Sequence, residues 1–300
     1  MLTPAMPPQP VPVYSGFDYV TVDAQRRRVY AAHGGAQRLL IADADTGKVV
    51  GQVRVGECHG VAVNPATGHV YVGVADDAVD EIDPVALKVV NRVATTGPVD
   101  AIAFDATNKR IYADEDDGTH MFIVDAATFK LVKTLDIPGH KPEYLAVDPA
   151  THDVYQNIDS DSEIAVVDAA TLTVSRTIKT PEIRHNHPLQ YDPAYREIVV
   201  AGGGVMSAYT PDGTKLGQTQ AGAFDQCDLD PTEHMLACAG GGGVTRYRLQ
   251  PAGAPKQLDT TQVAPGVHTL AVDPVTHAVF VVWADRDGNG DYMEKLVPSP

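Results

Sequence analysis

An Asp, Glu or His recurs along the chain at nearly even spacing, each time at the start of a short apolar phrase. These residues, here called the column, are Asp18, His59, Asp100, Glu143, His187, Asp225 and His268. The phrases run from FDYVTVD at 17–23 to VHTLAVD at 267–273, and subtraction of successive column positions gives intervals of 41, 41, 43, 44, 38 and 43 residues. A period near forty residues is typical of propellers and helical arrays. The chain is therefore predicted to hold seven equivalent units.

The composition of each unit distinguishes between those two architectures. The second unit reads HGVAVNP, HVYVGV, VDEIDP and KVVNRV, with short polar or turn-forming segments between these runs. Alternating Val, Ile, Tyr and Thr favour strands, whereas Gly, Pro, Asp and Asn favour the turns between them. Each unit is therefore predicted to be a meander of four antiparallel strands, and the fold to be all-β.

The repeated phrases resemble those of the YVTN-repeat, YncE-like family. The matching segments are GVAVNPATGHVYVG (60–73), YLAVDPATHDVYQN (144–157) and IVDAATFKLVKTL (123–135), and the resemblance extends over nearly the whole chain. It implies a seven-bladed β-propeller of four-stranded blades around a central channel, with the first strand of each blade lining that channel. It implies no particular activity, because propellers host many functions.

The two ends of the chain are predicted to close the ring together. The seventh unit stops after its third strand at YMEKLVP, and an unassigned strand-like VPVYSG precedes the first unit. We therefore expect a single propeller domain over 1–300, with a disordered tail at 1–9 and a closing strand at 10–16 that completes the last blade. Such closure leaves no exposed sheet edge.

The charge and hydropathy of the chain restrict its partners. A formal net charge of −16 argues against nucleic acid and anionic membrane surfaces as main partners. No apolar run approaches the roughly 20 residues of a membrane span. The first residues lack the pattern of a signal peptide, which indicates a cytoplasmic protein, or a periplasmic or secreted one if a leader was removed. We expect a monomer that acts on a small molecule.

The three cysteines are too few for a disulfide scaffold. Cys227 and Cys238 lie symmetrically about a turn and could face each other across one hairpin. Packing as two small buried residues is the favoured interpretation, and a bond between them is left open. Cys58 and His59 are adjacent, so a strand directs them to opposite faces, which argues against a catalytic Cys–His pair.

The column is the candidate functional site. Four carboxylates and three imidazoles that meet at one channel mouth repel or compete unless a cation binds among them, protons are shared, or the histidines become cationic. His59, His187 and His268 are spread around the axis and form a predicted metal tripod, with Glu143 as an additional ligand. Zinc is favoured, and iron, manganese or copper also suit imidazole ligands. A metal-free polar channel and a calcium site built from the acids are the alternatives.

Catalytic and substrate-binding roles are assigned around that tripod. Acid–base candidates are Asp18, Glu143, Asp225 and His185, and substrate-binding candidates are Asp100, Asp114, Asn157, His33, Lys141 and Arg184. This equipment favours a metal-dependent hydrolase of an ester, lactone or phosphoester through an activated water. A metal-dependent lyase or oxidase is an alternative, as is a non-catalytic binding or scaffold propeller with a structural ion.

A second cation motif lies near the C-terminus. Asp285, Asp287, Asn289 and Asp291 match the opening of a calcium loop, but its twelfth position is Leu296 instead of the usual Glu. The motif is therefore a candidate calcium site, with a Gly-rich hairpin as the alternative interpretation.

Overall fold

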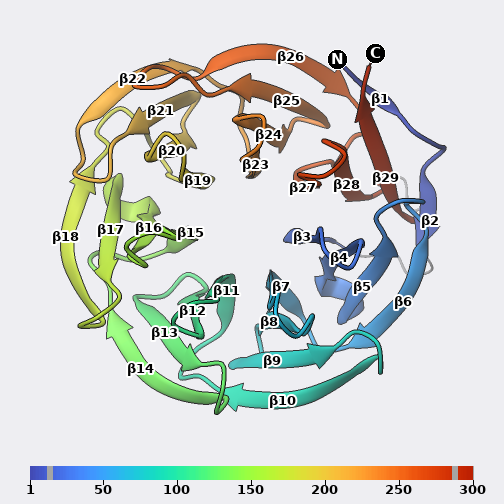
Figure 1. The fold of residues 1–300 in the computed structure, drawn as a ribbon, viewed down its shortest axis with the longest axis horizontal. Helices are drawn as coiled ribbons and strands as arrows, with labels where there is room; N and C mark the ends of the chain where they lie inside the picture. The colour runs from blue at the N-terminus through green and yellow to red at the C-terminus, as the bar shows by residue number, and fades with distance from the viewer. Residues whose placement is uncertain (12–15, 286–289, 300) are drawn as a thin grey trace.

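The computed structural model describes residues 1–11, 16–285 and 290–299, and it is a ring of seven antiparallel sheets (Figure 1). Each sheet is one blade, and in six of the seven blades the strands follow one another in sequence from the central channel to the rim; in the last blade the N-terminal segment takes the outermost place. The first strands of the blades surround the axis in Figure 1, and the two chain ends lie side by side at the rim. The predicted all-β, seven-bladed propeller is confirmed.

The first four blades follow the predicted meander. Blade 1 contains β3 (Val20–Asp23), β4 (Arg28–His33), β5 (Arg38–Asp43) and β6 (Val49–Arg54). Blade 2 contains β7 (Cys58–Val63), β8 (Val70–Val74), β9 (Ala78–Asp83) and β10 (Lys88–Ala94). Blade 3 contains β11 (Val99–Asp105), β12 (Arg110–Glu115), β13 (His120–Asp125) and β14 (Lys130–Asp136). Blade 4 contains β15 (Pro142–Val147), β16 (Val154–Ile158), β17 (Glu163–Asp168) and β18 (Thr173–Lys179).

The remaining blades include the two units with atypical, glycine-rich third strands. Blade 5 contains β19 (Leu189–Asp192), β20 (Glu197–Gly202), β21 (Val205–Tyr209) and β22 (Lys215–Gln220). Blade 6 contains β23 (Gln226–Asp230), β24 (Met235–Gly240), β25 (Gly243–Arg248) and β26 (Lys256–Gln262). Blade 7 contains β27 (Thr269–Val272), β28 (Val279–Ala284) and β29 (Asp291–Pro298). Two short 3-10 turns, η1 (Gly34–Ala36) and η2 (Asp159–Asp161), complete the described structure.

The N-terminal segment closes the ring, but it begins to pair earlier than expected. β1 (Leu2–Pro4) and β2 (Gln9–Val11) both pair with β29, so residues 2–4 are not the disordered tail that was predicted. These residues are ordered for two reasons. They pair with β29, and the side chain of Leu2, which is 2% exposed, is buried in the core at blade 7. Residues 12–15 of the expected closing strand lie outside the described residues.

The core lies between neighbouring blades. Second-strand tyrosines such as Tyr30, Tyr71, Tyr112 and Tyr155 are almost completely buried. One cluster joins Tyr30 to Val61 of the next blade, and another joins Tyr71 to Ile111 of the blade after that. Aromatic side chains bury large apolar areas, so each blade is stabilised mainly by its two neighbours.

The turn after each first strand adds a polar contact between blades. The fourth residue after the strand-ending Asp has a positive φ, as at Arg27, His152, His234 and His277. From there its side chain reaches the corresponding Asp of the preceding blade. These contacts, here called turn clasps, are His152–Asp105, His234–Asp192, His277–Asp230 and Arg27–Asp273. The last one joins blade 1 to blade 7.

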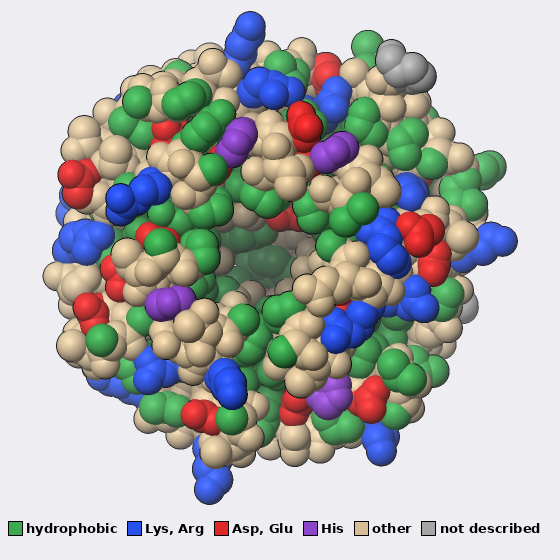
Figure 2. All heavy atoms as spheres, viewed as in Figure 1, with side chains coloured by type: hydrophobic (Ala, Val, Ile, Leu, Met, Phe, Trp, Pro, Cys, Tyr) green, Lys and Arg blue, Asp and Glu red, His purple; other side chains and the backbone are tan. Residues whose placement is uncertain are grey.

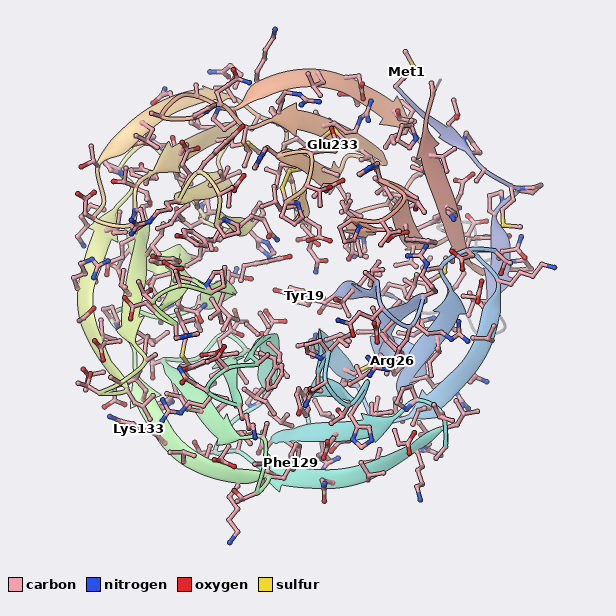
Figure 3. The ribbon with its side chains drawn as sticks, viewed as in Figure 1. Met1, Tyr19, Arg26, Phe129, Lys133 and Glu233 are labelled. Carbon is pink, nitrogen blue, oxygen red and sulfur yellow. A yellow bond between two sulfur atoms is a disulfide. The ribbon has the colours of Figure 1, made fainter. Side chains whose placement is uncertain are left out.

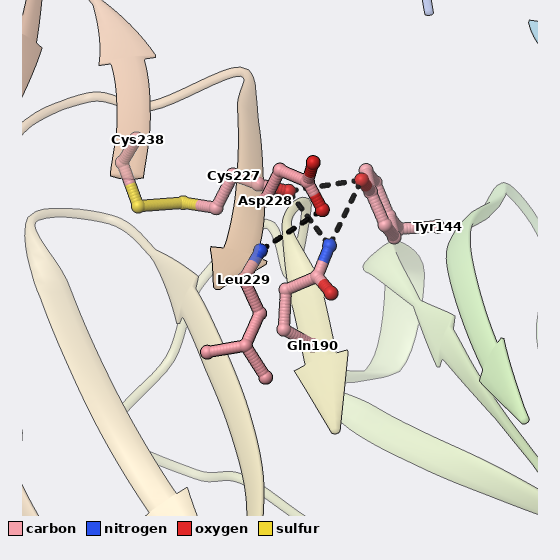
Figure 4. The surroundings of a disulfide bond; sticks show 6 residues. All are labelled: Tyr144, Gln190, Cys227, Asp228, Leu229 and Cys238. Carbon is pink, nitrogen blue, oxygen red and sulfur yellow. Dashed lines mark hydrogen bonds between the residues drawn. A yellow bond between two sulfur atoms is a disulfide. The ribbon is translucent and has the colours of Figure 1, made fainter. Parts of the chain in front are cut away.

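Cys227 and Cys238 form a disulfide between directly paired positions of β23 and β24 (Figure 4). The favoured interpretation of two unbonded cysteines is therefore corrected. Their Cα atoms are 4.0 Å apart, because the hairpin brings the two residues opposite each other. Cys58 is a buried free thiol. Within the described chain, no helix is long and apolar enough to cross a membrane.

Candidate functional site

Three column residues from adjacent blades form the tightest ionisable cluster at the channel. Asp18, His59 and Asp100 each place one ligand atom within 4.8 Å of the others, and we call them the first cluster. His59 Nδ1 lies 2.7 Å from Asp18 Oδ2 and 3.9 Å from Asp100 Oδ1. The three side chains are half-buried. Two carboxylates and one imidazole are a donor set that suits a divalent transition metal.

Glycine allows this close approach. A Cβ on Gly60, next to His59, would lie 2.3 Å from the carbonyl oxygen of Asp100, and a Cβ on Gly73 would lie 2.8 Å from the same atom. Such contacts are far shorter than van der Waals separation, so only glycine lets the backbones of β7 and β8 approach β11 this closely. The local sequence therefore brings His59 and Asp100 together.

A second cluster lies on the blades that follow. His187 Nε2 is 3.0 Å from Glu143 Oε2 and 3.4 Å from Asp225 Oδ1, so the imidazole lies between two carboxylates. We call these three residues the second cluster. They come from blades 4, 5 and 6, whereas the first cluster comes from blades 1, 2 and 3.

His268 is not grouped with the other two histidines of the predicted tripod. Its Nδ1 lies 2.7 Å from the carbonyl oxygen of Gly266, and its Nε2 lies 3.0 Å from the carbonyl oxygen of Phe17. Both ring nitrogens thus have backbone acceptors, and Nε2 also lies 3.9 Å from Asp225 Oδ2. The column contains an Asp–His–Asp cluster and a Glu–His–Asp cluster, with His268 at the edge of the second.

Three substrate or catalytic candidates extend the second cluster outward. Lys141 Nζ lies 3.2 Å from Glu143 Oε1 and 3.2 Å from Asp159 Oδ2. His185 Nδ1 lies 2.9 Å from Asp159 Oδ1, and its side chain is 83% exposed. Arg184 is exposed as well. Polar contacts thus run from solvent at His185 through Asp159 and Lys141 to Glu143.

The other predicted substrate-binding residues are buried inside blades. Asp114 accepts hydrogen bonds from the Ala101 amide at 2.6 Å and from Gln156 Nε2 at 2.9 Å. Asn157 donates to the carbonyl of His187 at 2.7 Å. His33 is 1% exposed, stacks on Phe17 and hydrogen-bonds through Nε2 to Asp291. These side chains support the channel wall from behind.

The predicted calcium motif is only partly described, because Asp287 and Asn289 lie outside the described residues. The backbone amide of Asp285 donates a hydrogen bond to the carbonyl of Gly290 at 2.9 Å, as in a hairpin. Asp291 is fully buried and contacts His33. The described part of the motif therefore belongs to the β28–β29 hairpin.

Burial and mutual repulsion alter the acids of the channel. Burial, followed by the charges of Asp114, Asp18 and Glu143, raises the pKa of Asp100 well above its usual value. Burial also raises the pKa of Asp225, although His187 opposes the shift. Burial and neighbouring acids thus both disfavour the ionised carboxylates, and a proton or a cation would relieve that cost.

The two clustered histidines shift in the same direction. Burial alone lowers the pKa of His187, but hydrogen bonding and charge from Glu143, with the charge of Asp225, outweigh it and raise that pKa to about 9. Burial is likewise outweighed at His59, where Asp18 raises the pKa. At neutral pH His187 is therefore an imidazolium held between two acids.

Two tyrosines, each one position after a column residue, meet across the channel. Tyr19, directly before β3, projects into the centre of the ring (Figure 3), and its ring centroid lies 5.4 Å from that of Tyr144 of blade 4. The Tyr144 hydroxyl donates to the carbonyl of Cys227 in blade 6 at 2.9 Å. We call this pair the tyrosine floor.

The floor and one supporting amide were not predicted from sequence. Gln226 donates from Nε2 to Asp18 Oδ1 at 3.1 Å, and its Oε1 accepts from Thr269. The position directly after the column residue is Tyr19 in blade 1 and Tyr144 in blade 4, but Gly60 in blade 2 and Ala101 in blade 3. Comparison of that position across the repeats was the signal that could have revealed the floor.

Comparisons with known proteins establish the fold and no more. The chain matches no family model and no curated protein. Among solved structures it is similar to a chain of Kuenenia stuttgartiensis hydrazine synthase, at 14% identity and a TM-score of 0.79, covering 94% of this chain and 96% of that one. It is also similar to a chain of a mitotic checkpoint complex, at 13% identity and a TM-score of 0.83, covering 99% of this chain and 92% of that one.

Proposed function

We propose that the first cluster binds a divalent transition metal and that the protein is a metal-dependent hydrolase of an ester, lactone or phosphoester. The observation that carries the proposal is the convergence of Asp18, His59 and Asp100 within 4.8 Å in an acid-rich channel. The donor set fits such an ion, and burial together with the neighbouring charges of Asp114 and Asp18 raises the pKa of Asp100. Zinc is favoured, with iron and manganese as alternatives.

A bound ion would supply Lewis acidity to a substrate carbonyl or phosphoryl oxygen and would activate a water. The chain's own residues supply the remaining chemistry. His187, protonated between Glu143 and Asp225, would donate a hydrogen bond to an anionic oxygen and a proton to the leaving group. Glu143, itself paired with Lys141, would fix the imidazole, which would regain its proton from solvent water. The tyrosine floor would restrict water entry from the other end.

One observation favours a second function, a non-catalytic binding propeller. Each clustered histidine already pairs with acids, at 2.7 Å for His59 and Asp18 and 3.0 Å for His187 and Glu143, so protonation alone balances part of the charge. In that case the channel end would bind a cationic ligand or a structural ion without turnover. From the repeat phrases we also infer membership of the YVTN-repeat, YncE-like family. A binding role is compatible with that family.

A substrate panel distinguishes the two functions. Aryl esters, lactones and aryl phosphoesters are tested with protein loaded with Zn²⁺ or Mn²⁺ and with the same protein after chelation. The hydrolase proposal expects turnover of one class that disappears on chelation and falls at least a hundredfold in His187→Gln. The matched control, His140→Gln, changes an exposed histidine and should retain full activity. Turnover that survives chelation, or none in any class, would sink the hydrolase.

A further inference from the structure

The channel has a second chamber on the turn side of the tyrosine floor. Two adjoining cavities of about 490 and 390 Å³ share Phe104 and Ala106 and together span the first strands of six blades. We call them the vestibule, lined chiefly by Val61, Ile102, Phe104, Val147, Gln190 and Leu229. Figure 2 shows a central hollow in the ring with hydrophobic side chains gathered on its walls.

Small residues make this chamber wide. Three positions after the column, the strands carry Thr21, Ala62, Ala103, Ala146 and Ala271, where large side chains would fill the axis. Successive residues of a strand advance by about 3.3 Å, so this layer lies about 10 Å beyond the column along the channel. The tyrosine floor lies between. Cavities of this size with mostly apolar walls are typical of small-molecule sites.

The same layer also carries the larger polar side chains of Gln190 and Asp228. Gln190 donates from Nε2 to the Tyr144 hydroxyl at 3.0 Å and to the Cys227 carbonyl at 2.7 Å, which fixes its position at the floor. Asp228 lies beside Tyr144 and Gln190 (Figure 4). Its carboxylate accepts only backbone amides, from Leu229 at 2.9 Å and Val272 at 2.7 Å.

Asp228 adjoins the vestibule, because it precedes Leu229 and lies beside Gln190, two residues of the cavity wall (Figure 4). Among the residues that the structure describes, no lysine, arginine or histidine forms an ion pair with it. Burial raises its pKa to about 6, so at pH 8 the carboxylate is still ionised. A partly buried carboxylate without a counter-ion is costly, and a ligand cation would relieve that cost.

We propose that the vestibule binds a small molecule with an apolar body and a protonated amine, the body on Phe104, Val147 and Leu229 and the ammonium at Asp228. Gln190 Oε1 is placed to accept a further hydrogen bond from the amine. An anionic ligand is excluded by the same carboxylate. The site differs from the metal cluster in position and chemistry, because the floor separates the two ends of the channel.

Calorimetry with three isosteric probes tests this site: benzylamine, benzyl alcohol and benzoate at pH 8. EDTA is present throughout, so the outcome does not depend on metal binding at the other end. We expect benzylamine to bind at least tenfold more tightly than benzyl alcohol, and benzoate not to bind. Equal affinity of amine and alcohol, or no binding of benzylamine at 10 mM, would overturn the proposal.

Variants locate the binding. Asp228→Asn keeps the shape and one acceptor, and it should reduce benzylamine affinity to that of benzyl alcohol. Val147→Phe narrows the cavity that Val147 and Leu229 line and leaves Asp228 in place, so it should weaken both probes at least tenfold. Asp136→Asn removes an equal charge from a side chain that is 94% exposed at the rim and should change neither. Unchanged benzylamine affinity in Asp228→Asn or in Val147→Phe contradicts the assigned location.

Discussion

Arg27 of blade 1 donates two hydrogen bonds to Asp273 of blade 7, at 2.8 Å and 2.7 Å, across 246 residues of sequence. The Asp273 side chain is fully buried, and the Arg27 side chain is 21% exposed. Bidentate geometry makes such a pair stronger than a single contact. The first and last blades are thus joined by a polar clasp as well as by the pairing of β1 and β2 with β29.

Replacement of Arg27 should open this junction. Arg27→Gln leaves the buried Asp273 carboxylate without its cation, and we expect the free energy of unfolding to fall by about 3 kcal/mol in urea titration. Arg28→Gln is the matched control, because Arg28 pairs with Asp43 where both side chains are partly exposed, and it should cost less than about 1 kcal/mol. If both variants lose the same free energy of unfolding, the Arg27–Asp273 clasp contributes no more than an exposed ion pair.

The disulfide in blade 6 gives a second prediction. It closes a loop of 11 residues, for which chain entropy predicts about 3 kcal/mol of stabilisation. Cys227→Ala with Cys238→Ala should lose about that amount, while Cys58→Ala, which leaves the bond intact, provides the comparison. Alkylation of unfolded protein should label one thiol before reduction and three after it. Three labelled thiols without reductant would contradict the bond.

The protonation of His187 predicts a pH dependence. Its pKa is raised from 6.5 to about 9 in the folded protein, so its contribution to stability is fully present below pH 6.5 and is lost as pH rises through 9. The free energy of unfolding should therefore fall by a few kcal/mol between pH 6.5 and pH 10. His187→Gln should flatten that part of the profile relative to His140→Gln. Identical profiles for the two variants would exclude His187 as the cause.

Sequence reasoning located the strands and the column because both depend on local periodicity. Residues at the head of each first strand do lie along the channel, and the hairpin symmetry of Cys227 and Cys238 was visible before their bond was known. Asp–Pro turns follow several first strands as expected, for instance at Asp148 directly after β15. Strand patterns and the column repeat from blade to blade, so an error in one unit is corrected by the others.

The grouping of the column could not be predicted in the same way. The two nitrogens of His268 bind the carbonyls of Gly266 and Phe17, which are details of one loop and of the neighbouring blade. The closeness of His59 and Asp100 depends on Gly60, whose role is apparent only when β7 and β11 are in contact. Repeat symmetry predicts equal distances between neighbouring column residues. The unequal side chains at these positions break that symmetry and form two clusters.

The metal content of the purified protein tests the central claim most directly. Protein prepared without chelator, then dialysed against Zn²⁺ or Mn²⁺ and freed of excess, is measured by plasma mass spectrometry. We predict one ion per chain in the wild type and in His268→Ala, and none in His59→Ala or Asp100→Asn. A metal-free wild type, or a His268→Ala variant that loses the ion as completely as His59→Ala does, would contradict the assignment of Asp18, His59 and Asp100 as the metal site.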